Sequence, residues 1–149
     1  MLLTFGIAIC LFLTTTVIHA EAMLFVMRRI RTVSKRELQG VYRSRIYKVG
    51  AIVIVMFLAS VAEVFVWALT YIALNAIEGL ERAMYFSMVT YTTLGYGEIV
   101  LDEQWRLLAS FEAANGIIMF GWSTAIVVAV VHRLYFKEPA MQNHSAAND

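Results

Sequence analysis

The residues best placed to do chemistry form the run Thr92-Thr93-Leu94-Gly95-Tyr96-Gly97-Glu98. Gly95 and Gly97 stand at alternate positions, and glycine adopts backbone angles that residues with a Cβ avoid. With such angles, successive backbone carbonyls can face one axis, where their oxygens replace the water of a dehydrated cation without adding net charge. The Thr93 hydroxyl can add one more oxygen, and Tyr96 is expected to point away from the axis. The competing interpretation is an ordinary loop with glycine turns.

Acidic residues follow this run at Glu98, Asp102 and Glu103. Carboxylates at the mouth of a cation site raise the local cation concentration, so Glu98 and Asp102 are candidate outer-mouth residues. The sequence offers no Ser/His/Asp set, no metal cluster and no phosphate-binding loop, and its one cysteine is Cys10. We therefore expect no enzyme and no cofactor, only a permeant ion.

The elements that must position this run are hydrophobic spans. The chain is 60% hydrophobic, with a mean hydropathy of +0.70, which suits a bilayer better than water. A spanning helix needs roughly 20 mostly apolar residues. Leu2–Met27, Val49–Leu74 and Leu107–Leu134 are long enough, whereas Ala83–Thr93 is too short and is interpreted as a re-entrant segment. The predicted fold is an all-α membrane protein with three transmembrane helices and a re-entrant pore helix.

Basic residues gather between Arg28 and Lys48, although the net charge is only +1 and gives no reason to expect nucleic-acid binding. The positive-inside rule makes residues 28–48 a cytoplasmic loop, which could also bind anionic lipid. The N-terminus and the glycine-containing run are then outside, and residues 135–149 form a short cytoplasmic tail.

The run resembles the pore signature of potassium channels, in which Thr-Val-Gly-Tyr-Gly is followed by Asp. Asn115–Ala125 is similar to the inner helix of simple bacterial potassium channels. The resemblance implies a two-transmembrane pore domain at 49–134 and an extra N-terminal transmembrane helix at 1–27. Within the pore domain it implies an outer helix at 49–74, a pore helix at about 80–91, a filter at 93–97 and an inner helix at 107–134.

The resemblance also implies a homotetramer, since one chain carries one filter loop, and passive potassium conduction across a prokaryotic plasma membrane. It implies that K⁺ binds at Thr93, Leu94, Gly95 and Tyr96, with Gly97 completing the filter. The implied cavity-lining and gate residues are Gly116, Ile117, Phe120, Thr124 and Ala125, with Gly116 as a bend. The alternatives are a non-selective cation channel, against which Tyr96 argues, and a non-conducting regulatory subunit, against which the intact filter argues.

Three positions depart from the family pattern. Leu94 stands where Val or Ile is usual, Glu98 replaces Asp, and Val89 stands where some bacterial members have a buried Glu. Because the acid at position 89 is missing, we expect weak filter inactivation. The first span also lacks the regularly spaced basic residues that a voltage sensor needs, so we expect little voltage dependence.

Polar residues inside the spans are further candidates. Glu63, near the middle of the second span, is a candidate sensor, because an intramembrane acid is a functional candidate by default. Counting depth from the basic loop predicts that hydroxyls among Thr14–Thr16 satisfy its carboxyl. His19 and Glu21 are expected at the interface and solvated, and the alternative for this pair is a proton-sensing role. The remaining expectations are an ion pair between Glu112 and Arg106, and a hydrogen bond from Asn115 to another helix.

Overall fold

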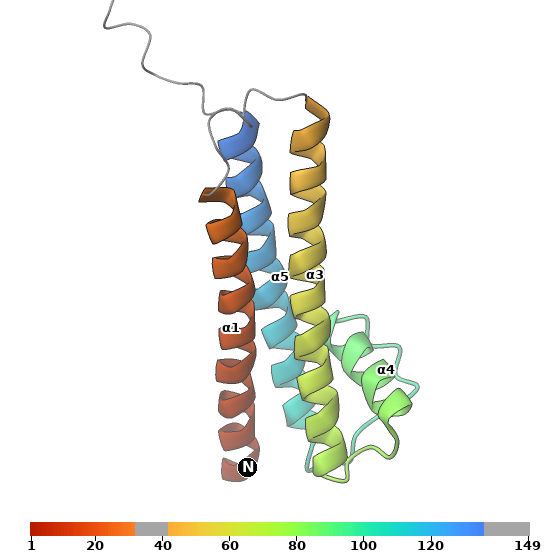
Figure 1. Cartoon of the computed structure of the whole chain (residues 1–149). Coiled ribbons are helices and arrows are strands. Elements are labelled where there is room, and N and C mark those ends of the chain that lie inside the picture. Colours follow the sequence, from red (N-terminus) through yellow and green to blue (C-terminus); the bar gives the residue numbers. More distant parts are fainter. Residues whose placement is uncertain (32–41, 136–149) are drawn as a thin grey trace, which may run out of the picture.

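The computed structural model describes residues 1–31 and 42–135, and these residues fold into helices (Figure 1). The helices are α1 (Leu2–Arg31), α3 (Tyr42–Ala73), α4 (Leu80–Tyr91) and α5 (Arg106–Tyr135). Over the described ranges the structure contains no strand, so the predicted all-α fold class is confirmed.

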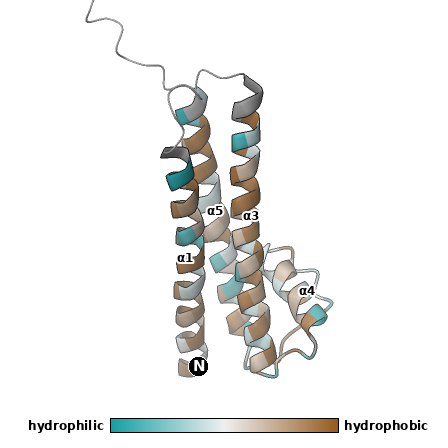
Figure 2. Ribbon diagram, in the orientation of Figure 1, coloured by the Kyte–Doolittle hydropathy of each residue, from teal (hydrophilic) through white to brown (hydrophobic). Residues whose placement is uncertain are grey.

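Three helices are long and apolar enough to cross a membrane, which confirms the expected number of spans. Their candidate spans are Leu2–Arg29, Ile46–Ala73 and Arg106–Arg133, each of 28 residues, where about 20 would suffice. The three helices lie side by side, and α1 and α5 run in the direction opposite to α3 (Figure 1). Most of their residues are apolar (Figure 2), and all three helices expose large apolar side chains, as a lipid environment requires.

The helices extend further than the sequence spans suggested. Helix α1 continues to Arg31 and α3 begins at Tyr42, so the expected basic loop at 28–48 is helical at both ends. Residues 32–41, which carry part of the expected lipid contact, lie outside the described residues, as do tail residues 136–149.

Helix α3 ends in a Schellman motif that turns the chain toward α4. Asn75 has a φ of 51°, and the N–H of Ala76 donates to the carbonyl of Tyr71 while the N–H of Asn75 donates to that of Ile72. Asparagine tolerates this left-handed conformation better than most residues. The chain then folds back, so that α4 lies beside α3 at the end of the molecule where α1 begins (Figure 1).

Two clusters of buried apolar residues hold the helices together. The larger cluster joins α1, α3, α4 and α5 and contains the fully buried Trp67, Tyr71, Tyr91, Leu108 and Met119. The smaller cluster, near the other end, contains Val26, Ile52, Met56, Ile126 and Val130. Helix α4 therefore packs against α3 and α5, and α1 packs against the same two helices.

Candidate functional site

The loop that follows α4 has a backbone of alternating handedness. Thr93, Gly95 and Gly97 have φ angles of 60°, 58° and 80°, while neither Leu94 nor Tyr96 between them has a positive φ. When right-handed and left-handed conformations alternate, successive N–H groups point to one side of the chain. The carbonyls then point to the other side, as a row of cation ligands requires.

The hydrogen bonds of this loop show that its first N–H groups point toward α4. The N–H of Thr93 donates to the carbonyl of Thr90 at 2.9 Å, and those of Leu94 and Gly95 donate to the carbonyl of Val89 at 2.9 and 3.2 Å. In a trans peptide the N–H and C=O point in opposite directions. The carbonyls of Thr92, Thr93 and Leu94, which share these peptide groups, therefore point away from α4.

The side chains of the loop leave a cleft between the loop and the helices. The cleft has a volume of about 250 Å³, and its lining includes Val89 of α4, Tyr96 and Ile99 of the loop, and Ala109 of α5. In the protomer Leu94 is 55% and Tyr96 is 65% exposed. Both side chains are therefore available to contact another chain.

A hydrogen bond ties the end of the loop that is farther from α4 in sequence back to that helix. The hydroxyl of Tyr85 donates to Oε2 of Glu98 at 2.7 Å, and both residues lie at the surface. This hydrogen bond is the main cause that raises the pKa of Tyr85 above its ordinary value, so the phenol stays protonated and remains the donor. Asp102 is also exposed, and its backbone carbonyl accepts the N–H groups of Trp105 and Arg106 at the start of α5.

The five expected cavity residues on α5 divide into two groups. Ile117, Phe120, Thr124 and Ala125 are exposed in the protomer, on the surface of α5 that the other helices leave free. Gly116 is buried instead, and α5 continues through it without a break. A Cβ built on Gly116 would lie 2.0 Å from the carbonyl oxygen of Tyr91, so this glycine allows α5 to touch the end of α4. The expectation that Gly116 lines a cavity as a bend does not match this position.

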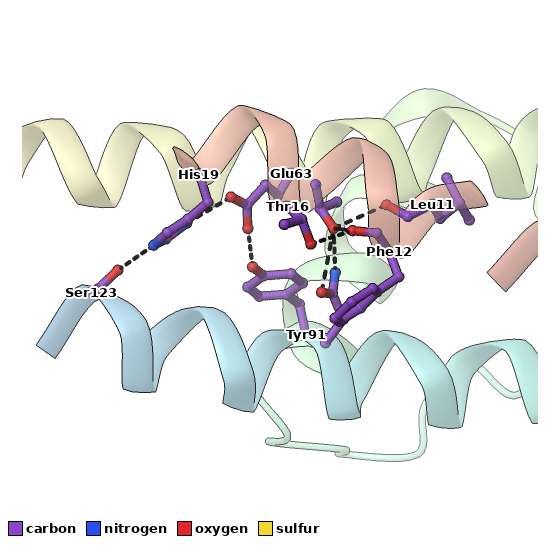
Figure 3. Close-up of polar contacts among 9 residues, drawn as sticks. Leu11, Phe12, Thr16, His19, Glu63, Tyr91 and Ser123 are labelled. Carbon is purple, nitrogen blue, oxygen red and sulfur yellow. Dashed lines mark hydrogen bonds and ion pairs between the residues drawn. The ribbon is translucent and has the colours of Figure 1, made fainter. Parts of the chain in front are cut away.

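Glu63 lies at the centre of a buried polar cluster (Figure 3). Its Oε1 is 2.8 Å from Nδ1 of His19 in α1, and its Oε2 accepts the hydroxyl of Tyr91, the last residue of α4. The expectation that Thr14–Thr16 satisfy the carboxyl is therefore wrong. The hydroxyls of Thr14 and Thr16 donate to carbonyls of their own helix.

His19 is fully buried, which contradicts the interfacial, solvated position expected for it. Its second ring nitrogen, Nε2, lies 3.1 Å from the Ser123 hydroxyl of α5 (Figure 3). Its ring also lies 5.3 Å from that of Trp122, measured between centroids. Glu21, in contrast, is exposed as expected.

A second buried carboxyl, that of Glu112 in α5, supports the middle of α4. It accepts the hydroxyl of Tyr71 at 2.7 Å and also contacts the hydroxyl of Ser87 in α4. The expected ion pair with Arg106 is wrong, because Nε of Arg106 donates to the carbonyl of Leu101 at 3.2 Å. Positions six apart on a helix do not share a face, whereas positions three or four apart do.

The expected hydrogen bond from Asn115 to another helix is confirmed. Nδ2 of Asn115 donates to the Thr15 hydroxyl of α1 at 3.0 Å, and both residues are buried. Helix α1 is thus attached to α5 by a neutral pair and to α3 by the His19–Glu63 pair. Among the described residues, no group of three or more His, Cys, Asp or Glu side chains could hold a metal ion.

Comparison with known proteins gives one result. A family model described as "Ion channel" matches residues 59–133, which comprise part of α3, all of α4, the loop and most of α5. No curated protein and no solved structure matches the chain. The matched stretch contains Glu63, Tyr91 and Glu112, whereas His19 on α1 lies outside it.

Proposed function

The chain belongs to the ion channel family, and from this premise we propose that it is one subunit of a potassium-selective channel built from four identical copies. It is a multi-pass membrane protein with three spanning helices. Residues 93–97 form the selectivity filter, in which K⁺ binds to the backbone carbonyls of Thr93, Leu94, Gly95 and Tyr96. The ion passes down its electrochemical gradient.

One observation carries this proposal: the alternating φ angles at Thr93–Gly97 combined with N–H groups directed back to α4. A row of carbonyls on one side of one loop makes a quarter of a cation-binding ring. Irregular backbone at membrane depth is tolerated only where it is buried in protein or lines an aqueous path. Four loops around one axis satisfy this condition, so the proposed assembly is a homotetramer.

The exposed residues of the protomer support the same assembly. The free surface of α5 carries Ile117, Phe120, Thr124 and Ala125, which we assign to the inner cavity and to contacts between subunits. Glu98 and Asp102 are exposed beyond the filter and attract cations to the outer mouth. The positive-inside rule places the N-terminus outside and the C-terminus in the cytoplasm.

Ion flux into liposomes that contain the purified protein tests the proposal. We expect uptake of K⁺ in preference to Na⁺, and block by barium. Gly95→Ala should abolish this flux, because Gly95 has a φ of 58°, at which a side chain is strained. Gly50→Ala is the matched control, since a Cβ at Gly50 would meet nothing within 4 Å and no positive φ is involved.

The same experiment separates the alternatives. Equal flux of K⁺ and Na⁺ would indicate a non-selective cation channel. No flux in any lipid, despite a correctly assembled tetramer, would favour a regulatory subunit. Equal loss of flux in Gly50→Ala and Gly95→Ala would mean that potassium flux does not depend on the backbone conformation of the proposed filter.

A further inference from the structure

A continuous chain of hydrogen bonds, buried except for a partly buried one at Ser123, links all four described helices. From α5 to α4, it runs from Ser123 to His19 at 3.1 Å, from His19 to Glu63 at 2.8 Å, and from Glu63 to the hydroxyl of Tyr91 (Figure 3). The exposed fractions of His19, Glu63 and Tyr91 are all 0%. The matched family region supplies three of these residues, while His19 comes from the additional helix α1.

This chain of hydrogen bonds ends at Tyr91, directly before the proposed filter. Tyr91 is the last residue of α4, and Thr93, two residues later, has a left-handed φ of 60°. The ring of Tyr91 packs edge-on against Phe120, with ring centroids 5.5 Å apart, and its backbone carbonyl lies against Gly116. Because close-packed interiors transmit small displacements, the position of the Tyr91 hydroxyl affects the base of the filter.

The charge of the His19–Glu63 pair decides how firmly Glu63 holds the hydroxyl of Tyr91. With one proton shared between the two side chains, the pair is neutral overall and both ring nitrogens are satisfied. Loss of that proton leaves an uncompensated buried carboxylate, which is costly. Gain of a second proton puts hydrogen on both the carboxyl and the ring, which removes the charge-assisted bond.

Ser123 allows the neutral and the charged ring to be accommodated. Its hydroxyl donates to Nε2 when that nitrogen is unprotonated and accepts from Nε2 when it is protonated. When Nε2 is protonated, the hydrogen of the Ser123 hydroxyl can turn to a carbonyl of α5. The neighbouring Thr124 hydroxyl donates in this way to the carbonyl of Phe120 at 2.9 Å. The cluster therefore has two hydrogen-bonded arrangements without any rearrangement of helices.

We propose that His19 is a positioning residue of the pore, which fixes the Glu63 carboxyl and through it Tyr91, and thereby makes conduction depend on the protonation of the His19–Glu63 pair. The inference rests on the proposed function. The groups that face His19 are Glu63 from α3, Tyr91 from α4 by way of Glu63, and Ser123 and Trp122 from α5. Of these, Glu63 is the one that changes charge together with His19.

The test is potassium flux in liposomes as a function of pH, with the same pH on both sides of the membrane. For the wild-type tetramer we expect a bell-shaped profile that belongs to the pair as a whole. Glu63→Gln keeps an acceptor for the Tyr91 hydroxyl but cannot ionise, so it should conduct with a flattened profile.

Two further variants separate positioning from simple docking of α1. His19→Phe leaves Oε1 of Glu63 without its partner and should lower the K⁺/Na⁺ flux ratio by about tenfold. Thr15→Val removes a different polar contact of α1, that with Asn115, and does not touch Glu63. It should keep the wild-type flux ratio and the wild-type pH profile.

Three results would overturn the inference while leaving the proposed function intact: a flat wild-type profile, an unchanged profile in Glu63→Gln, or an equal effect of Thr15→Val and His19→Phe. Absence of barium-sensitive potassium flux in the wild type, in contrast, would refute the proposed function itself, and the inference with it. If His19→Phe does not assemble, the profile of Glu63→Gln still decides the question.

Discussion

The backbone of Gly116 in α5 lies directly against the carbonyl of Tyr91 at the end of α4. An ideal Cβ on Gly116 would approach Tyr91 O to 2.0 Å and the Tyr91 carbonyl carbon to 2.9 Å. These atoms are backbone and cannot rotate away as a flexible side chain could. Helix α5 and the end of α4, directly before the proposed filter, are therefore in contact at a point where only glycine fits.

Gly116→Ala should consequently destabilise the protein and impair the filter. Overpacking of this kind costs about 1–3 kcal/mol, although alanine would otherwise favour a helix. Gly121→Ala is the matched control on the same helix, because a Cβ at Gly121 would meet nothing within 4 Å. Thermal unfolding of the tetramer in detergent should show a lower melting temperature for Gly116→Ala only. Equal melting temperatures for both variants would contradict the contact.

Glu112 should contribute to stability through its hydrogen bonds rather than through its charge. Glu112→Ala leaves the hydroxyl of Tyr71 without its buried acceptor, which costs about 1–3 kcal/mol, while the hydroxyl of Ser87 can still donate to the carbonyl of Val64. Glu112→Gln retains an acceptor oxygen and should lose much less. Unfolding curves of the two variants measure this difference. A larger loss in Glu112→Gln than in Glu112→Ala would argue against the assignment.

The bond between Tyr85 and Glu98 should prolong the conducting state of the filter. Tyr85→Phe removes the donor, and Glu98→Asp shortens the acceptor by one methylene while keeping its charge. We expect both variants to show a faster decay of potassium current under steady conditions, with little change in melting temperature because the pair is exposed. Recordings in planar bilayers measure the decay. Wild-type persistence in both variants would show that the bond has no effect on the filter.

The acidic mouth should act through long-range electrostatics. Asp102→Asn removes an exposed charge and should reduce potassium conductance at low ionic strength. At about 1 M salt the Debye length falls to about 3 Å, so the difference from wild type should disappear. Conductance measured against KCl concentration provides the test. An equal reduction at all concentrations would instead indicate a structural effect at the start of α5.

The sequence predicted the elements well because their signals are local. Hydropathy identified the three spans, and the positions of Gly95 and Gly97 predicted where the backbone takes positive φ. The positive φ of Thr93 could not be predicted in this way, since a β-branched residue rarely adopts it. There the hydrogen bond from its N–H to Thr90 and those of the next two residues hold the conformation.

The buried contacts were harder to predict because they depend on how helices are offset and rotated. Depth counting pointed to Thr14–Thr16 as partners of Glu63, but the partner on α1 is His19, three to five residues and about one helical turn away. The same count made from the observed ends, Arg31 of α1 and Tyr42 of α3, points to Cys10, so the difference comes from the offset between the two helices rather than from the bounds of the spans. An error of one turn was enough to exchange a threonine for a titratable residue.

The most direct test of potassium selectivity is the reversal potential of single channels in a planar bilayer with KCl on one side and NaCl on the other. A filter of backbone carbonyls at Thr93–Tyr96 predicts a reversal potential far from zero, in the direction that marks potassium as the permeant ion. Gly95→Ala should abolish the currents or shift the reversal potential toward zero. A wild-type reversal potential near zero would contradict potassium selectivity.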